Sequence, residues 1–226
     1  TRMASADCAK LISPIQGTSP MPDKSVCAIV DAYRQMAAGG LGTGSSGNIS
    51  TRVDGGMLIT PTGVVPSMLQ PSQLVFMTLA GEAGEDQLLP SSEWHMHAGI
   101  YRARTDVNAV VHCHSRHATI LACTGRSLPA VHYMIAISGG DEIPLAPYAT
   151  FGTPALAASA VTALGDAGLA CLLANHGQVA VGADLSQALR VAQEVEELAA
   201  IYCGSLAIGG VQILSAESMA EVHEAF

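Results

Sequence analysis

The stretch "VNAVVHCHS" (107–115) is a short apolar run that ends in two histidines two positions apart. An apolar run of this length predicts a buried strand. Residues two apart in a strand point to the same face, so His112 and His114 present two imidazole rings side by side. We therefore expect a buried strand that ends in a bidentate metal-binding pair.

Helical patterns occur on both sides of this strand. Apolar residues at i, i+3, i+4 and i+7 predict an amphipathic helix from Asp23 to the glycine pair at 39–40. A hydroxyl cap precedes a predicted helix over 93–104, with Glu93 as an acid in its first turn. A longer amphipathic helix is predicted over 185–208.

Short apolar pieces between turn signals predict the remaining strands. They lie around Ile49, at 57–60 and at 74–79, and "CLLANHGQVAVG" (171–182) indicates two strands around a turn. Strands mixed with flanking helices favour the α/β class, as one sandwich of sheet and helix layers. We expect this single domain over residues 22–226, after an irregular arm at 1–21 to which we assign no chemistry.

Composition limits the partners of the chain. With eight Arg, two Lys and a net charge of −9, it has no positive field to hold a polyanion, so nucleic acid and anionic membranes are poor partners. The uncharged stretch at 143–165 contains three prolines and is not predicted to cross a membrane. Six cysteines without a CxxC pair predict thiols rather than disulfides, and with no signal-peptide pattern we expect a cytoplasmic protein.

A catalytic zinc site needs three protein ligands and an open position, so a third ligand must join the histidine pair. His176, before a glycine at a predicted turn, is one choice, and spacing alone leaves His117 and His132 open as well. His95 and His97 lie on a predicted helix, where a spacing of two separates the side chains by about 200°. That second pair is a poor chelate, and ordinary hydrogen-bonded histidines remain the alternative for the first.

The scarcity of lysine bears on the mechanism. Lys10 and Lys24 are the only lysines, so Schiff-base catalysis has no evident buried amine. Carbanion chemistry in this chain would need a metal as electron sink and a carboxylate to move the proton, for which Glu93 is the natural candidate. The alternative for Glu93 is a helix acid favoured by the dipole.

Three turns rich in hydroxyls and glycine could together hold a phosphate without Arg or Lys. They are "SSGN" (45–48), "TPTG" (60–63) and "SS" (91–92), the last at a predicted helix N-terminus. Each turn alone is also typical of caps and tight turns. Their combination predicts a phosphate site.

Six motifs in order resemble the class II aldolase/adducin family, over a match that runs from about Lys24 to the C-terminus. The longest, at 132–153, is the most specific, and it favours the branch that cleaves L-fuculose 1-phosphate. The motifs are "SSGNIS" (45–50), "LITPTG" (58–63), "LPSSEW" (89–94), "VVHCHSRH" (110–117), "HYMIAISGGDEIPLAPYATFGT" (132–153) and "NHG" (175–177).

The resemblance implies an antiparallel-rich central sheet between helix layers and a homotetramer with active sites between subunits. It implies one Zn²⁺ per subunit, with Glu93 as the catalytic acid/base that also touches the metal, Tyr133 as proton donor and Phe151 lining the substrate pocket. The implied zinc ligands are His112, His114 and His176. The implied phosphate-binding residues are Gly47, Asn48, Thr62, Gly63, Ser91 and Ser92. A further Tyr is implied in a tail beyond "VHEAF" (222–226), where the given sequence ends.

The expected activity is zinc-dependent, reversible aldol cleavage of L-fuculose 1-phosphate to dihydroxyacetone phosphate and L-lactaldehyde. Cleavage of another deoxyketose 1-phosphate is the nearest alternative, followed by a sugar-phosphate epimerase or dehydratase. A non-catalytic interaction module of the adducin kind is the alternative of another class. The three histidines and Glu93 argue against that module, since adducin head domains lack the metal histidines.

Overall fold

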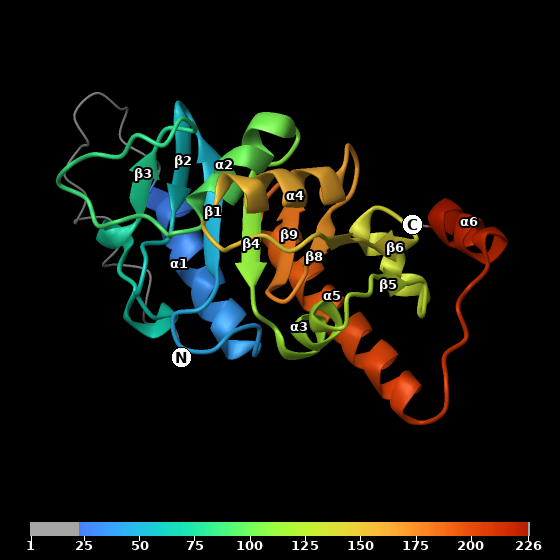
Figure 1. Ribbon diagram of the computed structural model, residues 1–226. Helices are drawn as coiled ribbons and strands as arrows, with labels where there is room; N and C mark the ends of the chain where they lie inside the picture. The colour runs from blue at the N-terminus through green and yellow to red at the C-terminus, as the bar shows by residue number, and fades with distance from the viewer. Residues whose placement is uncertain (1–22, 226) are drawn as a thin grey trace.

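A seven-stranded sheet, in the order β3-β2-β1-β4-β9-β8-β7, runs through the centre of the protein (Figure 1). The computed structural model describes residues 23–225, and the predicted arm at 1–21 lies outside the described residues. Every neighbouring pair of strands in this sheet is antiparallel except β7 and β8, which are parallel. The expected α/β fold with an antiparallel-rich sheet in a single domain is confirmed.

The strands are short, and most occur where apolar pieces predicted them. The central sheet contains β1 (Asn48–Val53), β2 (Gly56–Ile59), β3 (Val75–Met77), β4 (Ala109–Cys113), β7 (Leu145–Ala146), β8 (Ala170–Leu173) and β9 (Gly177–Gly182). A separate two-stranded sheet pairs β5 (Leu128–Pro129) with β6 (Glu142–Ile143).

Helices cover both faces of the central sheet. One layer contains α1 (Asp23–Ala38), α3 (Arg116–Cys123) and α5 (Leu185–Ala207), and the other contains α2 (Trp94–Ala103) and α4 (Pro154–Leu164). Short 3-10 helices, η2 (Pro66–Met68), η3 (Pro71–Gln73) and η4 (Tyr133–Ser138), lie in the connections, and α6 (Ala216–Ala225) packs beside η4.

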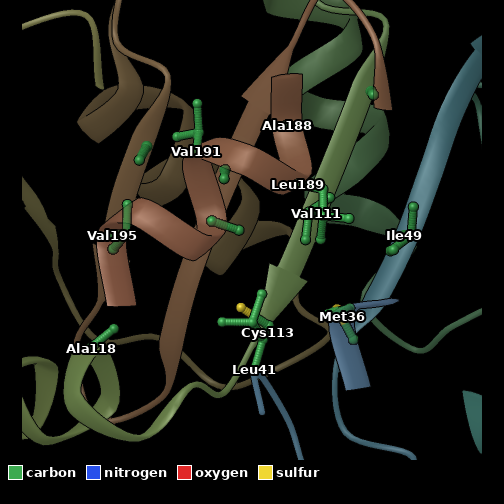
Figure 2. Packing of buried hydrophobic residues seen from close by; sticks show 14 of the residues in the cluster. Met36, Leu41, Ile49, Val111, Cys113, Ala118, Ala188, Leu189, Val191 and Val195 are labelled. Carbon is green, nitrogen blue, oxygen red and sulfur yellow. The ribbon is translucent and has the colours of Figure 1, made fainter. Parts of the chain in front are cut away.

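Alternation along β4 divides the core into two clusters. Val111 and Cys113 pack in the cluster that includes α1 and α5, whereas Val110 packs in the cluster that includes α2 and α4. Figure 2 shows the first cluster, in which Val111 of β4 packs together with residues of α5 such as Leu189. Since side chains alternate along a strand, His112 lies on the same face as Val110, toward α2. The strand at the centre of the sheet thus carries a histidine toward the second helix layer.

The long helix α5 forms for the reasons that its pattern indicates. Asp184 caps its N-terminus by accepting a hydrogen bond from the backbone N–H of Gln187 at 2.8 Å. The predicted apolar face is buried against the sheet and consists of Leu189, Ala192, Val195 and Leu198. The predicted helix and its packing face are confirmed.

Two expectations need correction. The helix predicted from Glu93 begins at Trp94, and Glu93 occupies the N-cap position without capping, because its carboxylate turns toward histidines instead. The prediction of thiols throughout is wrong for Cys27, which is disulfide-bonded, because spacing reveals only local cysteine pairs. The free thiols among the described residues are Cys113, Cys123, Cys171 and Cys203.

Within residues 23–225, no helix combines the length and the apolar character that crossing a bilayer requires.

Candidate metal centre

Strand register places the candidate site at one end of three neighbouring strands. Asn48, the first residue of β1, lies opposite His112 near the end of β4, and His112 lies opposite Val179 near the start of β9. His114 follows the end of β4, and His176 lies in the turn that joins β8 to β9. Residues far apart in sequence therefore meet at a single edge of the sheet.

Three imidazole rings surround a common point at this edge. The ring centroids of His112, His114 and His176 are 4.9, 4.8 and 4.8 Å apart, with interplanar angles of 72°, 72° and 69°. The Nε2 atoms of His112 and His114 are 3.0 Å apart. The structure thus brings together the three histidines that the family resemblance indicated.

The carboxylate of Glu93 closes the cluster from the start of α2. Its Oε2 lies 3.0 Å from Nε2 of His112, and its Oε1 lies 3.3 Å from Nε2 of His176. One donor atom from each of the four residues lies within 4.8 Å of every other.

The geometry of this cluster fits a divalent metal ion. Tetrahedral zinc with Zn–N bonds of about 2.0–2.1 Å separates neighbouring nitrogens by about 3.3 Å, close to the separations found here. Nδ1 of His112 lies 2.8 Å from the carbonyl oxygen of Gln178, and an N–H donated there leaves the Nε2 lone pair free for a metal. Oε1 of Glu93 is buried and has no hydrogen-bond partner among the described residues. A cation bound among the histidines would satisfy this oxygen.

The electrostatics also favour metal binding. Burial, together with the neighbouring His112, lowers the pKa of His114 and of His176 to about 4, so both rings are neutral ligands near pH 7. Burial alone would raise the pKa of Glu93, but His112, His176 and the amide of Asn48 hold it well below its usual value. Burial opposes a charge on His112, yet the adjacent Glu93 carboxylate holds the pKa of this imidazole above its ordinary value, so a metal that binds here would displace a proton from His112.

A pocket of about 340 Å³ opens beside the cluster, within the size range of small-molecule sites. Glu93, His114 and His176 line it at the cluster, and Tyr148 and Phe151 line it with largely exposed rings. All six predicted phosphate-binding residues also line it: Gly47, Asn48, Thr62, Gly63, Ser91 and Ser92. No Lys or Arg of the described chain lines the pocket, so an anion there would rely on hydroxyl and amide groups.

Other candidate residues lie elsewhere. Tyr133 begins η4, is half exposed and does not line the pocket of the single chain. His117 pairs with Glu196 at 2.8 Å, and the ring of His132 lies tilted against that of Tyr133, so neither joins the cluster. His95 stacks on a neighbouring tryptophan ring, which agrees with its rejection as a ligand.

Sequence reasoning missed the role of the fully buried His97. Its ring lies between α2 and β1 and bonds to Asn48 and Ser50. The spacing of four from Glu93 along a helix was a usable signal, because such residues share a helix face. That face was not identifiable as buried without knowledge of what packs on it.

We expect Gly177→Ala to destabilise the protein by about 1–3 kcal/mol. A Cβ at Gly177 would lie 2.5 Å from the carbonyl oxygen of Cys113 and 2.9 Å from Cδ2 of His114, so the end of β4 and the His114 ring must shift. Gly204→Ala in α5 is the matched control, because a Cβ there meets no atom within 4 Å. That variant should gain about 0.5–1 kcal/mol. Urea unfolding of both variants measures the difference, and equal stabilities would contradict the close packing.

Known proteins resemble this chain in sequence and in fold. The family model for the class II aldolase and adducin N-terminal domain matches residues 27–203. An L-fuculose phosphate aldolase of Escherichia coli is 47% identical over 199 residues, which cover 88% of this chain and 92% of that protein. A 5-methylthioribulose-1-phosphate/5-deoxyribulose-1-phosphate aldolase of Rhodospirillum rubrum is 46% identical over 198 residues, which cover 88% and 89%.

Solved structures agree with these relatives. A structure described as L-fuculose 1-phosphate aldolase superposes with a TM-score of 0.85 at 37% identity, covering 90% of this chain and 96% of that chain. Since the family model spans most of the chain and close relatives cover nearly all of it, the chain belongs to the class II aldolase and adducin family.

Proposed function

We propose that the protein catalyses reversible, zinc-dependent aldol cleavage of L-fuculose 1-phosphate to dihydroxyacetone phosphate and L-lactaldehyde. Class II aldolases are metal-dependent lyases that act on sugar phosphates, and the chain retains a Glu and three His able to hold a metal. The observation that carries the proposal is one pocket lined both by this cluster and by the hydroxyl- and glycine-rich turns.

A divalent ion held by His112, His114 and His176 supplies Lewis-acid stabilisation of negative charge on substrate oxygens. The nitrogen donors favour zinc over magnesium, which prefers oxygen ligands. The backbone carbonyl of Gln178 holds the ring of His112 in place through Nδ1.

Glu93 is positioned to move a proton at the reacting carbon. In cleavage the C3–C4 bond breaks, C4 becomes the aldehyde carbon as its hydroxyl loses a proton, and C3 must gain a proton to form dihydroxyacetone phosphate. Glu93 lines the pocket and directs its carboxylate toward the histidine cluster, where the reacting oxygens would lie. In condensation the same carboxylate removes that proton.

The hydroxyl- and glycine-rich turns that line the pocket would bind the phosphate group. Thr62, Ser91 and Ser92 provide hydroxyl groups, and Ser91 and Ser92 lie just before α2, where the helix dipole favours an anion. Gly47 and Gly63 have positive φ angles of 90° and 73°, a conformation that lets backbone approach a ligand closely. Binding the phosphate here would leave the sugar carbons next to Glu93.

The remaining assignments complete the proposal. We assign Tyr133 as the proton donor to the aldehyde oxygen, contributed in a homotetramer whose active sites lie between subunits. The half-exposed position of Tyr133 outside its own chain's pocket supports a contribution to a neighbouring subunit. Phe151, 65% exposed at the pocket, would contact the aldehyde portion of the substrate.

Cleavage of a 5-deoxypentulose 1-phosphate is the second candidate. The Rhodospirillum rubrum relative supports it, because its identity to this chain is within one percentage point of that of the Escherichia coli relative. Both reactions release dihydroxyacetone phosphate and differ only in the aldehyde.

The test is dihydroxyacetone phosphate release by the purified protein from L-fuculose 1-phosphate, 5-deoxyribulose 1-phosphate and 5-methylthioribulose 1-phosphate. We expect EDTA to abolish release, Zn²⁺ to restore it and Mg²⁺ to restore little. We expect kcat/KM to favour L-fuculose 1-phosphate by about tenfold or more.

The other outcomes are equally informative. Preference for a pentulose 1-phosphate would replace the proposed substrate within the same reaction class. Altered sugar phosphate without bond cleavage would indicate an epimerase or dehydratase. No reaction and no bound metal would favour the non-catalytic module.

A further inference from the structure

A line of buried polar residues lies between β1 and α2. Asn48, Ser50 and Arg52 occupy every second position of β1, and so point to one face of the sheet. Glu93, His97 and Tyr101 occupy every fourth position from the start of α2, and so share one helix face. The strand and helix periods bring these two rows together.

Hydrogen bonds connect this line from the pocket inward. Nδ2 of Asn48 donates to Oε2 of Glu93 at 3.1 Å, and Oδ1 of Asn48 lies 2.5 Å from Nε2 of His97. Nδ1 of His97 lies 2.6 Å from Oγ of Ser50, which lies 2.8 Å from the hydroxyl of Tyr101. None of these five residues is more than 6% exposed.

The chemistry of the side chains determines which atom donates and which accepts in each of these hydrogen bonds. The Asn48 oxygen can only accept, so Nε2 of His97 carries the proton and Nδ1 accepts from Ser50. Burial, together with the nearby His112, lowers the pKa of His97 to about 3, so the ring is neutral and has one donor and one acceptor. Burial raises the pKa of Tyr101 well above its usual value, so its hydroxyl keeps the proton that it donates to Ser50.

Glu93 and His97 together fix the orientation of the Asn48 amide. An Asn side chain can turn so that its oxygen and nitrogen exchange places, and only one orientation presents NH₂ to Glu93. The carboxylate of Glu93, which can only accept, and the N–H of His97 both require that orientation, because the reverse would set oxygen against the carboxylate and NH₂ against N–H. Oε2 of Glu93 is thereby held while Oε1 faces His176.

We propose that His97 is a positioning residue that, through Asn48, fixes the Glu93 carboxylate for metal binding and proton transfer. The part that concerns turnover rests on the proposed aldol reaction, whereas the part that concerns metal affinity does not. Apolar side chains could fill the space between β1 and α2 equally well, so packing alone does not explain the polar residues there. Leaving a buried polar group unpaired is costly, so a continuous series of paired groups that ends at Glu93 favours an orienting role.

Two nearly isosteric substitutions separate positioning from packing. His97→Gln places an amide NH₂ near the position of Nε2 and keeps the bond to Asn48, whereas His97→Asn places its amide near Nδ1 and loses that bond. Tyr101→Phe is the matched control, because it removes a buried hydrogen bond from the same interface without freeing the Asn48 amide.

Zinc affinity, measured by competition with a chelating dye, is the readout that needs no enzyme activity. We expect His97→Asn to weaken zinc binding about tenfold and to lower kcat about 10–100-fold, with a smaller change in KM. His97→Gln and Tyr101→Phe should stay within about threefold of the parent in zinc affinity and kcat. Thermal unfolding of each variant shows whether a loss of zinc affinity or kcat is accompanied by a loss of protein stability.

Equal behaviour of the two His97 variants, or native zinc affinity and kcat in His97→Asn, would overturn the proposal. If the parent protein cleaves no ketose 1-phosphate, the proposed function fails, and the zinc affinities still decide the role of His97. ¹⁵N NMR of the parent protein provides a test free of substitutions. The Nε2-protonated tautomer of His97 supports the proposal, and the Nδ1-protonated tautomer overturns it.

Discussion

Glu93→Gln is expected to lower kcat by about 10³-fold while zinc stays bound. The amide has the shape of the carboxylate and can still accept the hydrogen bond from Asn48 through an oxygen. It cannot take up or return a proton at the reacting carbon. Three histidine nitrogens remain to hold the metal, so its stoichiometry should stay near one per chain. Steady-state kinetics and metal analysis on the same preparation check both halves of this expectation.

The matched control for this substitution is Glu196→Gln. Glu196 also accepts hydrogen bonds beside a histidine, through His117 and the backbone at the start of α3, but it lies outside the pocket. We expect the turnover of Glu196→Gln to stay within about threefold of the parent, because the residue lies outside the pocket and the one amide oxygen still accepts from the backbone of α3. Full activity of Glu93→Gln would remove Glu93 from the proton-transfer step.

His114→Ala is expected to lose zinc and activity together. The Nε2 atom of His114 lies 3.0 Å from that of His112, and its ring is neutral, so removing it leaves two nitrogen ligands. Substituting a residue that only hydrogen-bonds to a metal ligand lowers metal affinity by about 10–100-fold, and losing a ligand itself should lower zinc affinity by more. Metal content after dialysis against a weak chelator, with aldolase activity on the same sample, measures the result.

His117→Ala provides the comparison for that variant. Spacing alone left His117 open as a third ligand, whereas the structure pairs it with Glu196 away from the cluster. We expect normal zinc content in His117→Ala. Normal zinc in His114→Ala together with zinc loss in His117→Ala would show that His117, and not His114, binds the metal.

Local patterns were enough for most of the fold. The helices α1 and α5 and the strands β1, β2, β3, β4, β8 and β9 formed where periodicity and turn residues predicted them. The predicted helix begins at Glu93, whereas α2 begins at Trp94. The pattern alone does not distinguish an acid in the first turn from an acid just before the helix. The disulfide at Cys27 was missed, since no local motif marks it.

Local sequence patterns also predicted part of the candidate site. The pair His112 and His114 follows from the alternation of side chains along an extended chain, and the phosphate turns follow from their glycines and hydroxyls. Spacing could not select His176, because its approach depends on the register between β4 and β9. The family resemblance supplied that choice before the structure did.

The sequence by itself determined the alternating strand pattern, the amphipathic helices, the histidine pair and the three polar turns, because each depends on residues only a few positions apart. Tertiary structure alone decided that Glu93 turns from its helix end toward His112 and His176, and that His97 lies against Asn48. It also decided that Tyr133 lies outside the pocket of its own chain. These features depend on how strands pair and how α2 packs on the sheet. Contacts between distant segments of this kind leave no periodic trace along the chain.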